Sequence, residues 1–133
     1  MILYWKVSLI SKLFSRHQEV EEGGPSLFVC WPGQSGNEYP YTAYPIDAEL
    51  PHLPGNYIYA AQSEEGEWIP LYVAQTRDLQ QRLERHEKLQ DATENGATHI
   101  HVHISTTGQA ARCNEEHDLI LRWRPMLNVE PKG

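Results

Sequence analysis

Two short β-rich segments joined by a polar loop constrain the fold of this 133-residue chain more than any other feature. Residues 56–62 (NYIYAAQ) alternate in character, and residues 68–74 (WIPLYVA) are rich in aromatic and branched side chains. Only the segment SEEGE, at residues 63–67, separates them. A loop this short joins strands that run in opposite directions, so the pattern predicts an antiparallel hairpin.

The segments that follow the hairpin alternate between helical and strand patterns. Thr76 or Asp78 can cap a helix that is predicted to run to about residue 90. Residues 98–105 (THIHVHIS) alternate strictly and predict a third strand, and residues 110–123 predict a second helix. We therefore expect an α+β fold in which helices flank a small antiparallel three-stranded sheet.

Residues 1–50 are predicted to be an N-terminal extension of this domain, which covers residues 51–133. The extension begins with an apolar stretch that Lys6 and Lys12 interrupt. We expect a helix there that packs on the domain or on a second subunit, and a helix lying in a membrane interface is the alternative. The apolar face of this helix would carry Ile2, Trp5, Leu9 and Leu13.

The rest of the extension contains two β-rich runs after a polar linker at residues 18–25. Residues 26–31 (SLFVCW) predict a strand. Residues 38–46 (EYPYTAYPI) are also extended, but proline cannot donate to a strand ladder. Pro40 and Pro45 therefore predict that this second run lies at a sheet edge or in a loop.

The charge balance argues against tight, unaided binding of nucleic acid. The chain has 18 Asp and Glu against 11 Lys and Arg, a net charge of −7. Strong binding to a polyanion draws on clustered Lys and Arg that displace counterions. To hold nucleic acid firmly, a chain of this composition would need an uncommon substrate, or a protein partner or second subunit bound through residues 1–50.

Cysteine usage and hydropathy bear on the compartment. Cys30 and Cys113 are too few and too far apart for a disulfide framework or a CxxC metal site. They predict two reduced thiols in a cytoplasmic protein. The chain contains no run of about 18 apolar residues, so we expect no membrane span.

A series of short motifs runs in order through residues 54–128. The set consists of Pro54-Gly55-Asn56-Tyr57, Tyr72-Val73-Ala74, Arg82, His86, Glu116, Pro125 and Asn128. In its order and spacing this set resembles the GIY-YIG nuclease domain family. The resemblance implies the small α+β fold of that family and the activity of a metal-dependent endonuclease, with DNA as the expected substrate.

The proton chemistry is implied to lie with the aromatic residues of the set. Phenols can carry protons or form hydrogen bonds with a phosphate. The resemblance implies that Tyr57 is the base that activates water, and that Tyr72 and His86 assist it. Which of the three takes the proton stays open, because spacing alone does not decide it.

The remaining motif residues are implied to handle charge. The planar guanidinium of Arg82 suits a phosphate oxygen, and the Glu116 carboxylate is a hard ligand for Mg²⁺ or Mn²⁺. The resemblance implies that Arg82 steadies the phosphate, that Glu116 binds a single divalent ion and that Asn128 supports the site. Together these groups supply the parts needed to hydrolyse a phosphodiester.

Two residues depart from the motifs of the family. Ala74 replaces a glycine, which costs stability only where the backbone needs a positive φ or a close approach. Asn56 replaces a branched residue, which loosens a strand slightly. With the acidic charge, these departures favour an alternative function. The chain would then be a non-catalytic binding or scaffold protein on the same fold, using its N-terminal segment to reach a partner or a membrane surface.

Three histidines alternate along the third predicted strand. His99, His101 and His103 fall on one face, because every second residue of a strand points the same way. We expect this face to be polar and partly exposed. A Zn²⁺ or Ni²⁺ site and a role facing the substrate are the alternatives.

Overall fold

The computed structural model describes residues 27–84 and 87–128. The predicted N-terminal helix, the linker and His86 lie outside these residues. The elements in chain order are β1 (Leu27–Pro32), β2 (Glu38–Pro45), β3 (Gly55–Gln62), β4 (Trp68–Thr76), α2 (Leu79–Glu84), α3 (Glu87–Glu94), β5 (His99–Ile104), α4 (Gln109–Trp123) and the 3₁₀ helix η1 (Met126–Asn128). None of the described helices has the length and apolar character that crossing a membrane requires.

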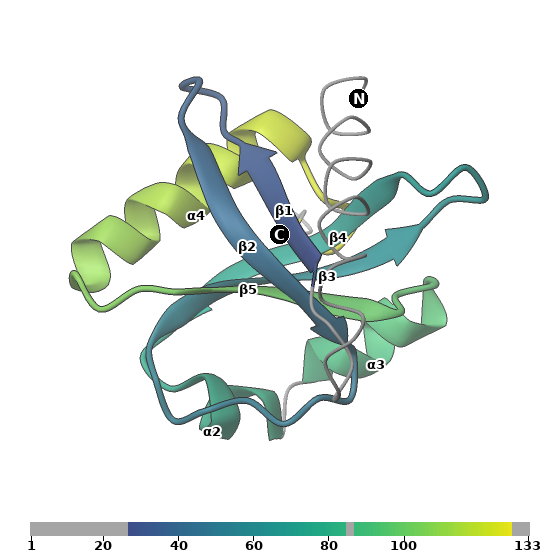
Figure 1. Ribbon diagram of the computed structural model, residues 1–133, viewed down its shortest axis with the longest axis horizontal. Coiled ribbons are helices and arrows are strands. Elements are labelled where there is room, and N and C mark those ends of the chain that lie inside the picture. Colours follow the sequence, from purple (N-terminus) through teal and green to yellow (C-terminus); the bar gives the residue numbers. More distant parts are fainter. Residues whose placement is uncertain (1–26, 85–86, 129–133) are drawn as a thin grey trace, which may run out of the picture.

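The strands form one antiparallel sheet in the order β1-β2-β5-β3-β4 (Figure 1). The α+β class and the predicted hairpin, β3 with β4, are confirmed. The predicted three-stranded sheet was too small, because the β1–β2 hairpin adds two strands beside β5. Strand β3 is therefore paired on both sides, and β4 is an edge strand.

The prediction that the second run of the extension lies at an edge or in a loop is wrong, because β2 lies between β1 and β5. Each proline nevertheless lies where only one neighbour is paired. Pro40 faces Cys30 of β1 and comes before the pairing with β5, which starts at Thr42. Pro45 faces His99 of β5 and lies beyond the last pair with β1. The missing amide donors therefore break no ladder.

Helices cover both faces of the sheet. Helix α4 lies on one face, and α2 and α3 lie on the other (Figure 1). Trp31, Trp68 and Leu119 are buried in the core beneath α4. Tyr57 and Leu79 are buried in the core beneath α2 and α3. Both faces are apolar interior, so β3 is buried from its first residue through its sixth.

His101 lies inside this core, which corrects the prediction of a partly exposed histidine face. Its side chain is 0% exposed, and Trp31 Nε1 donates a hydrogen bond to His101 Nδ1 at 2.9 Å. The ring of Trp68 packs against it edge to face, with 4.5 Å between the centroids. Burial, and to a lesser degree His99, lowers the pKa of His101 to about 3. The imidazole is therefore neutral at pH 7, with its proton on Nε2.

The other two histidines of the strand have separate partners. His103 Nδ1 lies 2.9 Å from an oxygen of Glu115, and His99 packs against Trp68 with 4.9 Å between the centroids. Within residues 27–84 and 87–128 no group of three His, Cys, Asp or Glu could hold a metal ion. The three imidazoles therefore lie in three different environments along the strand.

Acid should destabilise the folded chain through His101. Its folded-state pKa of about 3 lies below the ordinary value of 6.5, so the unfolded chain binds more protons between these values. This contribution to stability is complete above pH 6.5 and falls as the pH drops towards 3. His101→Gln keeps an acceptor for Trp31 but cannot titrate. Between pH 7 and pH 5 the free energy of unfolding, measured with urea, should therefore fall by about 2 kcal/mol more in the wild type than in His101→Gln.

The range from pH 7 to pH 8 provides the control for this measurement. Over that range the wild type and His101→Gln should show nearly the same change in the free energy of unfolding, because the folded-state pKa of about 3 and the ordinary value of 6.5 both lie below it. An unchanged pH dependence in His101→Gln would show that the buried imidazole does not govern acid stability.

Candidate active site

The β3–β4 hairpin gathers three tyrosines on one face of the sheet. Tyr59 lies directly opposite Tyr72, and Tyr57 lies opposite Ala74, so Tyr57 and Tyr72 are diagonal neighbours. The ring centroids are 6.3 Å apart for Tyr57 and Tyr72, and 6.2 Å apart for Tyr59 and Tyr72. Tyr59 was not among the predicted site residues. The two-residue period of a strand, which puts Tyr57 and Tyr59 on one face, could have indicated it.

Arg82 approaches this tyrosine cluster from helix α2. Its guanidinium interacts with the hydroxyls of Tyr57 and Tyr72, and the interaction with Tyr57 is the main cause that raises the pKa of Arg82. The side chain is otherwise exposed. The Nζ of Lys88 lies over the Tyr72 ring at 5.6 Å from the centroid. Two cations therefore border the tyrosines.

Burial sets the acidity of Tyr57. Desolvation raises the pKa of the Tyr57 phenol, Tyr72 and Glu116 raise it further, and Arg82 opposes the shift. The phenol is therefore neutral at pH 7 and holds its proton tightly. It can accept a proton from water only if it passes its own proton to another acceptor.

Glu115 and Glu116 are adjacent in sequence but have different environments on α4. Glu115 is buried, accepts a hydrogen bond from Tyr41 Oη at 2.6 Å and pairs with His103. Glu116 is half-buried, and desolvation raises the pKa of its carboxyl group while His117 opposes the rise. Within the described residues no hydrogen bond or ion pair engages Glu116. Of the two carboxylates, Glu116 is the one available to a ligand.

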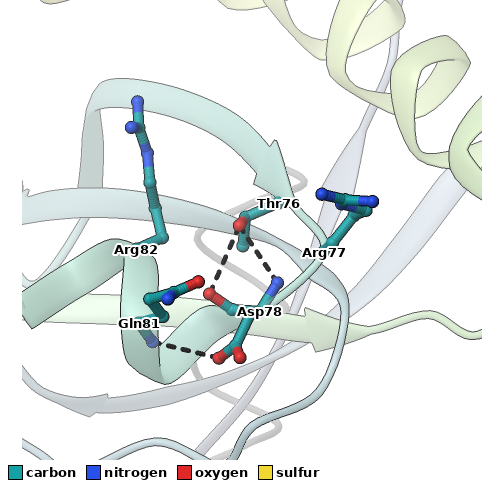
Figure 2. A pocket seen from close by; sticks show the side chains of 5 residues that line it. All are labelled: Thr76, Arg77, Asp78, Gln81 and Arg82. Carbon is teal, nitrogen blue, oxygen red and sulfur yellow. Dashed lines mark hydrogen bonds between the residues drawn. The ribbon is translucent and has the colours of Figure 1, made fainter.

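An open hollow of about 620 Å³ lies where β4 leads into α2. Its lining is formed by Thr76, Arg77, Asp78, Gln81 and Arg82. Figure 2 shows that Arg77 and Arg82 extend away from Asp78 on different sides. Asp78 is occupied in the turn itself, because its Oδ1 accepts a hydrogen bond from the Gln81 amide at 3.0 Å and so caps α2. The two guanidinium groups are therefore the charges that this hollow offers to a ligand.

Asn128 fastens the end of the described chain to the edge strand. Its Oδ1 accepts a hydrogen bond from the Val73 amide at 2.8 Å, and its Nδ2 donates one to the Val73 carbonyl at 2.9 Å. Val73 follows Tyr72 directly, so these bonds hold the backbone from which that phenol projects. Pro125, which is buried, accepts a hydrogen bond from the Asn128 amide and closes the 3₁₀ turn. Asn128 is positioned to orient the site rather than to contact a substrate.

The two departures from the motifs have local explanations. Ala74 is an ordinary strand residue, because Arg124 alone has a positive φ among the described non-glycine residues. Asn56 is fully buried, and its Nδ2 donates a hydrogen bond to the Arg112 carbonyl at 2.9 Å, which ties β3 to α4. Arg112 is itself buried and donates from Nε to Gln75 Oε1 at 3.0 Å. Sequence reasoning missed this link between the strands and α4.

The structure thus brings part of the predicted set together. Tyr57, Tyr72 and Arg82 are in contact, and Glu116 lies close enough to Tyr57 to affect its pKa. Asn128, in η1, is joined to β4 by its two hydrogen bonds with the backbone of Val73. A single half-buried carboxylate suits Mg²⁺ or Mn²⁺, which take the rest of their ligands from water and phosphate. The donor set present at Glu116 therefore fits one divalent ion of this kind.

Comparison with solved structures found the GIY-YIG N-terminal endonuclease domain of UvrC from Thermotoga maritima. A point mutant of that domain bound to its catalytic divalent cation has a TM-score of 0.50 and 24% identity over 60% of this chain and 87% of that chain. The domain bound to magnesium as its catalytic divalent cation has a TM-score of 0.49 and 25% identity over 59% of this chain and 86% of that chain. No protein-family model and no curated protein matched the sequence. The chain therefore has the fold of a GIY-YIG endonuclease domain, as its motifs predicted.

Loss of Asn128 should loosen the edge strand. Asn128→Ala removes both side-chain hydrogen bonds to Val73 and should lower the free energy of unfolding by about 1–3 kcal/mol, measured with urea. Asn114→Ala is the matched control, because Asn114 is exposed on α4 and its loss should leave stability nearly unchanged. Equal stabilities for the two variants would contradict the positioning role.

Proposed function

We propose that this chain is a metal-dependent endonuclease that hydrolyses phosphodiester bonds in nucleic acid. The observation that carries the proposal is the contact of Arg82 with two tyrosine hydroxyls beside an open hollow, with the unpaired Glu116 carboxylate nearby. The fold shared with a GIY-YIG endonuclease domain supports this choice. DNA is the proposed substrate, and the two free cysteines support the cytoplasm as the proposed compartment.

Arg82 is the proposed phosphate clamp. Its guanidinium lines the hollow and also interacts with the hydroxyls of Tyr57 and Tyr72, so Arg82 would link a bound phosphate to both phenols. A fork of fixed donors stabilises the charge that builds up on the phosphoryl oxygens in the transition state. Tyr57 would receive a proton from the attacking water and give its own proton to a phosphoryl oxygen bound by Arg82, because its pKa is too high for a resident phenolate.

Glu116 is the proposed ligand of the divalent ion. Bound Mg²⁺ or Mn²⁺ would lower the pKa of water and stabilise charge on the phosphoryl oxygens. The carboxylate is partly desolvated, and this costs free energy that a bound cation would offset. Asn128 would keep Tyr72 in place through the backbone of Val73.

Two conservative substitutions test the proposed chemistry. Tyr57→Phe and Glu116→Gln should each reduce the rate of nicking of supercoiled plasmid DNA, with Mg²⁺ or Mn²⁺ present, by at least about 100-fold. Tyr44→Phe and Glu94→Gln are the matched controls and should keep the wild-type rate. Nicking that survives both site substitutions would refute the mechanism. If the wild type nicks the plasmid no faster than a sample without protein, the non-catalytic binding role on this fold is favoured.

Thermal unfolding tests the metal site without relying on activity. Mg²⁺ or Mn²⁺ should raise the unfolding temperature of the wild type, since an ion at ten times its Kd adds about 1.4 kcal/mol to stability. Glu116→Gln removes a desolvated charge, so its unfolding temperature in EDTA should equal or exceed that of the wild type. The same variant should show no response to metal. An equal response in both proteins would place the ion elsewhere.

A further inference from the structure

A second hollow lies between α4 and the end of β5. We name it the His103 hollow, and its volume is about 510 Å³. Its polar lining is formed by Tyr39, His103, Ser105, Thr106, Thr107, Asn114 and Glu115. None of these residues belongs to the proposed active site. The lining is rich in hydroxyl and amide groups and contains one imidazole.

The imidazole of His103 is held in a fixed orientation by buried neighbours. Its Nδ1 lies 3.0 and 2.9 Å from the two oxygens of Glu115, and Tyr41 Oη donates to the same carboxylate at 2.6 Å. The rings of Tyr41 and His103 are 5.5 Å apart. A carboxylate only accepts, so Nδ1 carries a proton and donates. The nitrogen left for a ligand in the hollow is Nε2.

The hollow presents donors that suit a phosphate oxygen. To donate to a phosphate oxygen, Nε2 must carry a proton as well as Nδ1, and the buried Glu115 would then balance the positive charge inside the protein. Ser105 and Thr107 add hydroxyls that lie 3.4 Å apart, and Thr106 adds a third. Apart from Glu115, which His103 and Tyr41 already occupy, the lining has no carboxylate that would repel an anion.

The position of the hollow connects it with the proposed active site. Gly55 of β3 pairs with Thr76 on one side and with Ile104 on the other, so β4 and β5 end level with each other. Thr76 lines the hollow of the active site, and Ile104 lines the His103 hollow. Strands two places apart in a sheet are about 10 Å apart. A nucleic-acid strand advances about 3.4 Å along the helix axis per phosphate, so this distance corresponds to a few nucleotides.

We propose that the His103 hollow binds a backbone phosphate of the nucleic acid, a few nucleotides from the bond that is cleaved. This inference rests on the proposed function, because it assigns a second contact to the same substrate. His103 is the proposed phosphate ligand, and Glu115 is a positioning residue that acts through it. Such a contact would also let an acidic chain hold a polyanion without a stripe of Lys and Arg.

Binding in EDTA tests this contact independently of cleavage. His103→Gln should raise the Kd for a fluorescent 20-base-pair DNA duplex about tenfold, measured by fluorescence anisotropy. Thr107→Val changes an exposed hydroxyl at the rim, leaves the buried pair intact and should weaken binding in the same direction. His99→Gln, on the same face of β5, is the matched control and should bind like the wild type.

Nuclear magnetic resonance identifies the ligand chemistry. Inorganic phosphate should shift the His103 imidazole signals of the wild type, ribose should not, and Glu115→Gln should weaken the phosphate response. A ribose response with no phosphate response would overturn the proposal, as would the absence of duplex binding or equal Kd values for His103→Gln and His99→Gln. If His103→Gln binds the duplex more weakly than His99→Gln while the wild type nicks no DNA, the nuclease proposal fails and the phosphate site stands. If the wild type nicks DNA while His103→Gln and His99→Gln have equal Kd values, the phosphate site fails and the nuclease proposal stands.

Discussion

The double pairing of β3 is the constraint on which the arrangement of both hollows depends. Its pairing with β4 brings Tyr57 and Tyr72 to one face, and its pairing with β5 places His103 opposite Asn56. Gly55 is needed where these two ladders begin. A Cβ added there would lie 2.7 Å from the His103 carbonyl oxygen and 3.1 Å from a Leu79 methyl group. A larger residue at this position would disturb the end of β5 and the packing of Leu79 on α2.

Helix α4 holds its two neighbouring carboxylates, Glu115 and Glu116, in different environments. Adjacent helical residues differ by about 100° in direction, so one turn can carry one carboxylate towards the core and leave the next at its border. Glu115 is satisfied by Tyr41 and His103, and a buried carboxylate with two hydrogen bonds costs little. Glu116 has no such partner among the described residues, and burial raises its pKa. A charge left in this state destabilises the ligand-free fold, which is typical of functional sites.

Local patterns were sufficient to predict the elements that carry the candidate site. The alternation of β3, the short loop after it and the strict period of β5 depend on neighbouring residues only, and the motif spacing indicated the fold. The position of β2 could not be predicted in this way, because whether a proline is tolerated depends on which strand lies beside it. Pro40 and Pro45 each meet an unpaired side of β2, and the pairing partners come from residues far along the chain.

The environments of the histidines and glutamates were equally non-local. The sequence pattern put His101 on one face of a strand, but that face is buried because α4 and the side chains of Trp31 and Trp68 pack on it. Trp31, 70 positions away, donates a hydrogen bond to Nδ1 of this buried imidazole, whereas Nε2 has no partner among the described residues. Likewise, the partners of Glu115 come from β2 and β5, so no local signal separated it from Glu116.

The net charge of −7 constrains how this fold could act on a polyanion. Long-range attraction would be weak, so binding would depend on a few donors that are already oriented. Arg82 interacts with two phenols, Lys88 lies over the Tyr72 ring, and His103 is held by Glu115. Each side chain has lost rotational freedom before a ligand arrives, so the entropy cost of binding is reduced. Positioned donors of this kind can compensate for a surface with few basic residues, because they contribute through geometry where an acidic protein lacks attraction at a distance.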